Sequence, residues 1–259
     1  MIRQRLIPCV LLCFLALLGK TVAAFENHQG EKFPFSIAVN TQDNPSPTVL
    51  ISHGSICRGS QEVDWAARFR SLGLNTVIVD HCTLRRIQPH PAAEPPPLRV
   101  QDRVNDYIVA AEWVKAQKWH DGKIVVFGIS RGGEAVVRAT DARFNRGYRG
   151  DEGLAELDLF IALYPACNYF PRSPRKPILI MHGEEDNLAL FRRCEYETLE
   201  HQNYTIKTYP NAHHGFDVMG PDNTGYNKFI GNYVLSRFNP RAASQSVADI
   251  RAFLSQHLK

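Results

Sequence analysis

The feature that most constrains the fold of this chain is the alternation of short, continuous apolar runs with longer segments of helical periodicity. Runs such as Ile124–Phe127 and Ile178–Met181 do not alternate with polar residues. Such runs are typical of strands that are covered on both faces. Strands that alternate with helices imply right-handed crossovers and a mostly parallel sheet. The sequence therefore predicts an α/β fold, with helices on both faces of a central sheet.

The expected elements follow from these patterns. Strands are expected at Phe33–Val39, Thr48–Ser52, Thr76–Asp80, Lys123–Phe127, Leu157–Tyr164, Pro177–Met181 and Thr205–Tyr209. Helices are expected at Gln61–Leu72, Val100–Lys118, Gly132–Ala142, Leu188–Gln202 and Ala242–Leu258. In the second of these helices the apolar side chains recur at helical spacing, so we expect its charged residues on the opposite face.

Two segments interrupt this alternation of expected strands and helices. Thr83–Leu98 is rich in proline and arginine and cannot form a helix or a central strand. It follows an expected strand at the sheet edge where α/β proteins bind ligands, so it is either a plain surface loop or one wall of a substrate cleft. Met219–Asn239 is expected to be a second long connection, rich in glycine and asparagine. Neither stretch is typical of a domain linker, so residues 25–259 are expected to form a single domain.

The first 24 residues have the pattern of a secretory signal peptide. Met1–Arg5 forms a cationic head, Leu6–Gly19 is an apolar run of 14 residues, and Val22-Ala23-Ala24 places small residues before the expected cleavage site. A membrane-spanning helix needs about 20 apolar residues, so the run is too short for an anchor. We therefore expect residues 1–24 to be removed and the mature protein to be secreted or periplasmic.

The charge of the chain also depends on this segment. The formal net charge is +4, from 30 basic and 26 acidic residues. Residues 1–24 contain three of the basic residues and none of the acidic ones, so the mature chain carries 27 against 26. A chain with this balance has no polybasic surface for nucleic acid or for a membrane.

Export changes the interpretation of the cysteines. Cys9 and Cys13 lie in the expected signal peptide, and four cysteines remain in the mature chain: Cys57, Cys82, Cys167 and Cys194. An even number of cysteines in an oxidising compartment predicts two disulfides, with three possible pairings. No pair is spaced as CxxC, which argues against a zinc ribbon or a thioredoxin-type site.

The motif with the most chemical content is Gly128-Ile129-Ser130-Arg131-Gly132-Gly133. It follows an apolar strand and opens a helix, which is the context of a nucleophile elbow. A serine on such a strained turn exposes its hydroxyl group, and the glycines leave room for the tight backbone. We therefore expect Ser130 to act as a nucleophile, with negative charge on the substrate favoured by the amino end of the helix.

Candidate partners for Ser130 follow the last two expected strands, the acid first and the histidine second. The carboxyl ends of parallel strands meet at one edge of a sheet, so these residues are expected at the same edge as Ser130. An imidazole at this edge can accept the serine proton, and a carboxylate can orient the imidazole.

The acid is assigned to Asp186, and we expect its neighbours Glu184 and Glu185 to be solvated loop charges. The base is assigned to His214. From the residues alone, His213 is an equally good candidate, because both histidines follow the same expected strand.

An oxyanion hole requires two backbone N–H groups that point at the developing negative charge. One is expected from Arg131, the residue after the nucleophile. The other is expected from the turn His53-Gly54-Ser55-Ile56, which follows the Thr48–Ser52 strand. Ser55 is the assigned donor and Ile56 is the alternative, while His53 is expected to brace the turn.

Together these residues resemble the dienelactone hydrolase-like branch of the α/β-hydrolase superfamily, from about Phe33 to the final helix. The resemblance rests on the turn and the serine motif described above, on Asp186 after His182-Gly183, and on Ala212-His213-His214-Gly215-Phe216-Asp217. It implies the α/β-hydrolase fold, and it favours His214 because the family's histidine immediately precedes Gly-Phe. The founding dienelactone hydrolases use a cysteine nucleophile, whereas position 130 is serine. This difference favours ordinary esters over dienelactone as substrates.

The resemblance also bears on the disulfides. Leu163-Tyr164-Pro165-Ala166-Cys167 and Arg193-Cys194 are similar to a pair seen in secreted relatives. This similarity implies a Cys167–Cys194 disulfide and leaves Cys57 to pair with Cys82.

The expected activity is therefore hydrolysis of a small-molecule carboxylic ester, with no metal and no organic cofactor. Two alternatives stay open. A serine peptidase of the prolyl-oligopeptidase type shares this catalytic domain, but the sequence shows no propeller repeat upstream of it. A non-catalytic binding module could retain the same fold. A metal site is disfavoured because no HExxH or similar ligand pair occurs among the histidines near strand ends, namely His53, His81, His182, His213 and His214.

Overall fold

The computed structural model describes most of the chain. The described residues are 20–26, 32–87, 98–141, 150–166, 170–191, 194, 196, 200–228 and 230–258. The strands are β1 (Lys20–Glu26), β2 (Lys32–Asn40), β3 (Ser46–Ser52), β4 (Asn75–Asp80), β5 (His120–Ile129), β6 (Leu159–Leu163), β7 (Ile178–Gly183), β8 (Tyr204–Tyr209), β9 (Asn223–Asn227) and β10 (Asn232–Ser236). The helices are α1 (Ser60–Ser71), α2 (Val100–Lys115), α3 (Arg131–Ala139), α4 (Gly150–Ala155) and α5 (Pro240–His257).

The central sheet has the strand order β1-β2-β4-β3-β5-β6-β7-β8. The strands from β3 to β8 are parallel, and β2 joins this block as an antiparallel neighbour of β4. After β3 the chain moves to one side of the sheet to form β4, and β5 then pairs with the other side of β3. The carboxyl ends of β3 and β5 therefore form a topological switch point, where open α/β sheets bind their ligands.

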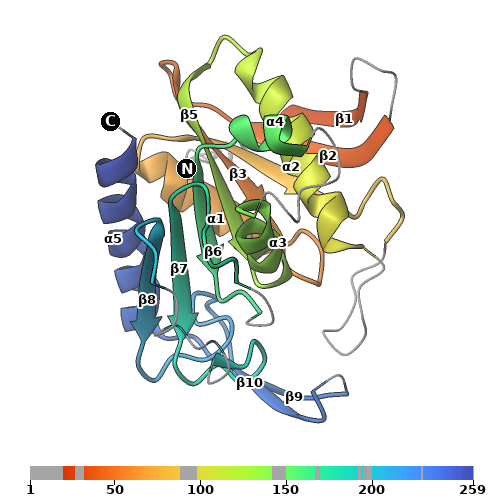
Figure 1. The fold of residues 1–259 in the computed structure, drawn as a ribbon. Coiled ribbons are helices and arrows are strands. Elements are labelled where there is room, and N and C mark those ends of the chain that lie inside the picture. Colours follow the sequence, from red (N-terminus) through yellow and green to blue (C-terminus); the bar gives the residue numbers. More distant parts are fainter. Residues whose placement is uncertain are drawn as a thin grey trace, which may run out of the picture.

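Helices cover both faces of this sheet, as Figure 1 shows. Along β3, Leu50 packs into the core beneath α2 and α3, whereas Val49 and Ile51 pack on the opposite face beneath α1 and α5. Successive strand residues point to opposite faces, so both sets must be apolar when both faces are covered. The predicted α/β class with a mostly parallel sheet is confirmed.

Several expected elements differ from the structure. The described residues of Leu188–Gln202 lie in turns, in 3₁₀ conformation or in irregular chain rather than in an α-helix, and Leu190 has a φ of +57°. A positive φ is incompatible with a continuing right-handed helix, so the apolar spacing in this segment was misleading. The remaining residues of that expected helix lie outside the described residues.

The predicted long connection at Met219–Asn239 contains regular structure. Its strands β9 and β10 form an antiparallel hairpin, which lies beyond the carboxyl ends of β7 and β8 in Figure 1. In the other long connection, Thr83–Leu98, residues 88–97 lie outside the described residues. The short helix α4 and the strand β1 were not expected from the sequence.

The charged residues of α2 do not all face solvent, which corrects the expectation from its amphipathic spacing. Arg103 and Asp106 are buried. They bond to loops at the carboxyl ends of β3 and β4, and these tertiary partners compensate for burial of their charges.

The N-terminal strand β1 spans the predicted cleavage site after Ala24 and pairs with β2. Among the described residues, none of the helices combines the length and apolar character that are needed to cross a membrane.

Candidate active site

Ser130 lies in a strained backbone conformation between β5 and α3. Its φ is +52° and its ψ is −111°, which is an unfavourable region for a residue with a Cβ atom. The flanking glycines permit this turn because a Cβ atom on Gly128 would lie 2.3 Å from the Gly132 carbonyl oxygen. A Cβ atom on Gly132 would lie 2.7 Å from the carbonyl oxygens of both Ser52 and His53. The glycines are therefore required by close backbone approach, as the sequence motif predicted.

The structure brings His214 and Asp186 to this serine. His214 Nε2 lies 3.1 Å from Ser130 Oγ, and His214 Nδ1 lies 2.7 Å from Asp186 Oδ2. His213 points elsewhere, with its Nδ1 atom 3.1 Å from the carbonyl oxygen of Glu185. The geometry therefore selects His214 over His213 as the partner of Ser130. It also selects Asp186 over Glu185. The Glu185 side chain is exposed, and its backbone N–H donates to the Ala212 carbonyl oxygen.

The two loops that carry this pair contact one another closely. A Cβ atom on Gly183, at the end of β7, would lie 2.3 Å from the carbonyl oxygen of Ala212 in the loop after β8. Glycine at this position lets the backbones of the two loops that carry Asp186 and His214 approach each other.

The environment of Asp186 favours its ionised form. Burial by itself raises the pKa of this carboxyl, but the electrostatic interaction with the His214 imidazole and hydrogen bonds from His182 and His214 lower the pKa well below its usual value. Asp186 Oδ1 also accepts hydrogen bonds from the backbone N–H groups of Leu188 and Ala189, at 2.9 and 2.8 Å. His182 Nε2 lies 3.2 Å from Asp186 Oδ2. A carboxylate that accepts this many bonds is held as an anion in a fixed orientation.

The backbone segments of the two expected oxyanion donors both lie next to Ser130. Arg131 is the first residue of α3, so its N–H group lies among those at a helix start that have no intrahelical acceptor. A Cβ atom on Gly54 would lie 3.5 Å from the Ser130 Cβ atom, which places the turn after β3 directly beside the serine. Within the described residues, the N–H group of Ser55 in this turn bonds to no protein acceptor.

Tyr164 is also part of the site, although no role was expected for it from the sequence. It follows β6 with a φ of +35°, and its ring centroid lies 4.4 Å from that of His214. Its hydroxyl group donates to Asp217 Oδ1 at 2.8 Å, while Asp217 Oδ2 accepts from Trp65 Nε1 at 2.7 Å and from Gln61 Nε2 at 2.8 Å. These bonds fix the aromatic ring that packs against the imidazole. The signal in the sequence was the position of Tyr164 at the carboxyl end of the expected strand Leu157–Tyr164.

A second polar network lies behind the turn after β3. His81 Nδ1 lies 2.6 Å from Asp106 Oδ2, and Arg85 binds both carboxylate oxygens of Asp106 at 2.8 Å. Burial raises the pKa of Asp106 to about 7. Ser52 Oγ lies 3.0 Å from His81 Nε2. A second serine, histidine and aspartate therefore contact one another in series. The side chains of His81 and Asp106 are fully buried, as is Ser52, so this network supports the loops and is not open to substrate.

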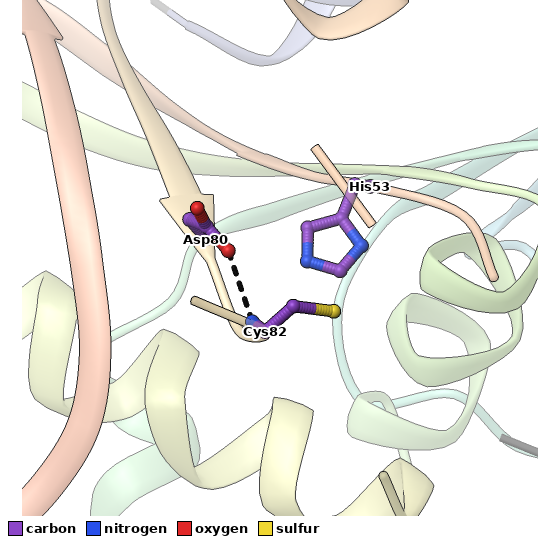
Figure 2. Close-up of side chains that lie close together, drawn as sticks. All are labelled: His53, Asp80 and Cys82. Carbon is purple, nitrogen blue, oxygen red and sulfur yellow. Dashed lines mark hydrogen bonds between the residues drawn. The ribbon is translucent and has the colours of Figure 1, made fainter. Parts of the chain in front are cut away.

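Figure 2 shows His53, Asp80 and Cys82, whose potential metal-binding atoms all lie within 4.8 Å of one another. The chemistry of these atoms does not suit a metal centre. Cys82 forms a disulfide with Cys57, so no thiolate is present, and Asp80 Oδ1 accepts from the backbone N–H groups of Cys82 and Thr83. His53 Nε2 accepts from the backbone N–H of His81. The cluster therefore links the loops after β3 and β4.

The Cys57–Cys82 disulfide is the pair expected for these two cysteines. It joins the turn after β3 to the loop after β4. For the second expected pair, Cys194 is buried, and Cys167 lies outside the described residues.

The fold and the arrangement around Ser130 define the class of protein as an α/β hydrolase. The sequence profile of the dienelactone hydrolase family matches residues 96–258, which is more than half of the chain. The chain belongs to the dienelactone hydrolase family. It matches none of the curated protein sequences.

Solved structures share this fold at low sequence identity. A dienelactone hydrolase-like promiscuous phosphotriesterase from metagenomic libraries is 14% identical, with a TM-score of 0.65, and the match covers 93% of this chain and 99% of that one. An esterase from Pyrobaculum calidifontis is 20% identical, with a TM-score of 0.60 over 93% of this chain and 86% of the other. Esterase 2 of Thermogutta terrifontis, in a form phosphoramylated by tabun, is 17% identical, with a TM-score of 0.64 over 93% and 95% of the two chains.

Proposed function

We propose that this protein is a secreted serine hydrolase that cleaves a small-molecule carboxylic ester. The observation that carries the proposal is the continuous chain of contacts from Ser130 Oγ through His214 to Asp186 Oδ2. Membership of the dienelactone hydrolase family supports hydrolysis as the reaction type. Because position 130 is serine rather than cysteine, ordinary esters are the substrate class that we favour.

The first half of the proposed reaction is acylation. His214 Nε2 accepts the proton of Ser130 Oγ while this oxygen attacks the ester carbonyl carbon. The carbonyl oxygen becomes an anion and accepts hydrogen bonds from the N–H groups of Arg131 and Ser55. Asp186 stabilises the imidazolium that forms, and His214 then donates its proton to the departing alcohol oxygen. The carbon–oxygen bond breaks, leaving the acyl group on Ser130.

The second half is deacylation, which repeats the same steps with water. His214 accepts a proton from a water molecule, whose oxygen attacks the acyl carbon. When the tetrahedral intermediate collapses, the proton returns from His214 to Ser130 Oγ, and the carboxylic acid leaves. No group of the protein is consumed in the cycle.

The proposal is tested by turnover of p-nitrophenyl acetate and by labelling with a fluorophosphonate. We expect the purified protein to hydrolyse the ester and to be labelled at Ser130, and we expect Ser130→Ala to lose both properties while keeping its circular dichroism spectrum. Ser71→Ala, on the outer surface of α1, is the matched control and should behave as the unchanged protein. A folded protein that neither turns over a panel of esters nor reacts with the probe would instead be a binding module.

Secretion is the second part of the proposal, supported by the cationic head, apolar run and small residues of positions 1–24. Cleavage after Ala24 removes most of β1, an edge strand that pairs only with β2 in the central sheet. Among the described residues, β1 lies outside the parallel block from β3 to β8 that positions Ser130. Expression of the full chain in a bacterial host, followed by N-terminal sequencing of the exported protein, should give Phe25 as the first residue. A cytoplasmic product that begins at Met1 would contradict it.

A further inference from the structure

Arg103 is a buried cation whose closest partners are backbone carbonyl groups. Its side chain extends from α2 to the turn after β3 and is 1% exposed. One terminal nitrogen donates to the carbonyl oxygen of His53 at 2.8 Å, and the other donates to that of Gly54 at 3.1 Å. The guanidinium group therefore holds two successive carbonyls of the turn that lies beside Ser130.

Burying the charged guanidinium group of Arg103 costs free energy, so its presence here needs an explanation. Burial lowers the pKa of Arg103 to about 10, so the group remains a cation at neutral pH. The carboxylate of Asp106, on the same helix, is engaged by Arg85 and His81. A buried cation without its own carboxylate partner is unfavourable compared with a neutral donor. A neutral hydrogen-bond donor could also bond to these two carbonyl groups, so their hydrogen bonding alone does not require an arginine.

The ring of His53 reinforces the same carbonyl. Its Nε2 atom accepts a hydrogen bond from the backbone N–H of His81 at 3.1 Å, so the ring proton lies on Nδ1. The Nδ1–H group then donates to the Gly54 carbonyl oxygen at 2.8 Å. Burial, followed by the charge of Arg103, lowers the pKa of His53, which keeps the ring neutral and in this tautomer. The Gly54 carbonyl therefore accepts two hydrogen bonds from inside the protein.

The direction of this carbonyl determines the direction of the next N–H group. In a trans peptide the C=O of one residue and the N–H of the next lie in one plane and point in opposite directions. The Gly54 carbonyl points inward to Arg103 and His53, so the Ser55 N–H of the same peptide points outward from them. Gly54 lies directly beside the Ser130 Cβ atom. A rotation of this peptide would break both inward hydrogen bonds.

We propose that Arg103 is a positioning residue that locks the Gly54–Ser55 peptide with its N–H group directed at the oxyanion of the substrate. The inference rests on the proposed ester hydrolysis at Ser130. Arg103 does not touch the substrate in this scheme; it acts through the backbone of the turn. It keeps a hydrogen-bond donor in place before the reaction, so no reorganisation is needed when the negative charge develops.

The test compares an ester with the matching thionoester, in which sulfur replaces the carbonyl oxygen. Sulfur is a weak hydrogen-bond acceptor, so an oriented oxyanion donor accelerates the ester more than the thionoester. We expect Arg103→Met to lower kcat for p-nitrophenyl acetate about 10- to 100-fold with KM changed less than about 3-fold. The ratio of kcat for the ester to kcat for the thionoester should fall by about the same factor as kcat for the ester. Titration of active sites with a fluorophosphonate corrects both rates for unfolded protein.

The control and the second variant separate this role from a purely structural one. Arg138→Met removes another largely buried arginine, which bonds to Glu134 in α3, and it should leave the ratio unchanged. Arg103→Lys keeps the charge but cannot span both carbonyls as a planar fork, so a smaller fall in the ratio is expected. A folded Arg103 variant with the original ratio would overturn the inference.

The proposed function and this inference can fail separately. If the unchanged protein hydrolyses no ester and Ser130 is not labelled, the function itself is wrong. If hydrolysis depends on Ser130 but the ratio is insensitive to Arg103, only the positioning role is wrong. Should neither Arg103 variant fold, a crystal structure of the phosphonylated protein decides. The phosphonyl oxygen must then accept from Ser55 N–H, and an oxygen directed away from it would overturn the inference.

Discussion

The ring of Tyr164 lies against the imidazole of His214, with the two ring centroids 4.4 Å apart and the planes inclined by 56°. The imidazole is thus held by packing on one side, in addition to its hydrogen bonds with Ser130 and Asp186. The hydroxyl group of Tyr164 faces away from this contact and bonds to Asp217. The ring and the hydroxyl group therefore have separable roles.

Tyr164→Phe and Tyr164→Ala should differ for this reason. The phenylalanine variant keeps the ring, and Asp217 retains its bonds to Trp65 and Gln61, so we expect kcat within about 3-fold and a loss of about 1 kcal/mol in the free energy of unfolding. The alanine variant removes the ring, and we expect kcat to fall at least about tenfold because the imidazole loses its packing. Ester turnover and urea denaturation measure these effects. Equal activities of the two variants would show that the ring does not position His214.

Asp186→Asn should lower kcat about 10³- to 10⁴-fold, because the amide cannot stabilise the imidazolium or favour the required tautomer. Glu185→Gln removes the adjacent carboxylate without touching His214, and it should stay within about 3-fold of the unchanged protein. Steady-state kinetics with p-nitrophenyl acetate provide the comparison. If the Glu185 substitution were the damaging one, the acid would be misassigned.

The low pKa of Asp186 predicts a specific loss of stability in acid. The folded protein holds this carboxyl's proton less tightly than the unfolded chain, whose aspartate pKa is about 3.9. The stabilisation is therefore complete above about pH 5 and is lost as the pH falls through about 4 toward the lower folded value. Thermal unfolding of the unchanged protein and of Asp186→Asn should show a difference in Tm that shrinks between about pH 5 and pH 3. A constant difference over this interval would argue against the shift.

Gly132→Ala should damage both folding and activity. The new Cβ atom would lie 2.7 Å from two carbonyl oxygens at the end of β3, so the backbone must move. We expect a loss of about 2 kcal/mol in the free energy of unfolding and a large loss of kcat, because α3 and the turn after β3 separate. Gly225→Ala in the β9–β10 hairpin is the control, since a Cβ atom there has no neighbour within 4 Å. Similar behaviour of the two variants would contradict the close approach.

Replacement of both Cys57 and Cys82 by serine tests the link between the turn and the loop after β4. The two residues are 25 positions apart, and closing a loop of this length stabilises a protein by about 3 kcal/mol in the chain-entropy description. We expect that loss in urea denaturation, together with a fall in kcat, because Ser55 is two residues before Cys57 in the same turn. Unchanged unfolding and kinetics would mean that the hydrogen bonds alone hold the turn.

Local sequence patterns predicted much of the fold and of the candidate site of this protein. The continuous apolar runs predicted a doubly covered parallel sheet, because strand residues on both faces must be apolar when both faces are buried. The glycines around Ser130 predicted the tight turn after β5, because only residues without a Cβ atom permit that backbone approach. Ser130, Asp186 and His214 were expected at one edge of the sheet because each follows a strand, and parallel strands bring their carboxyl ends to the same edge. The first two of these inferences use residues within a few positions of one another, and the third uses only the position of each residue after a strand.

Only the tertiary structure decided which residues meet across the chain. Arg103 and Asp106 looked like solvent-facing charges of an amphipathic helix, but loops 50 and 25 positions away supply their partners. The choice of His214 over His213 depends on a contact with a serine 84 positions earlier. Leu188–Gln202 has the apolar spacing of a helix, yet Asp186 binds the backbone at its start and the chain turns at Leu190. Periodicity records which side chains share a face of one element, whereas these outcomes depend on long-range contacts that form only when the elements pack together.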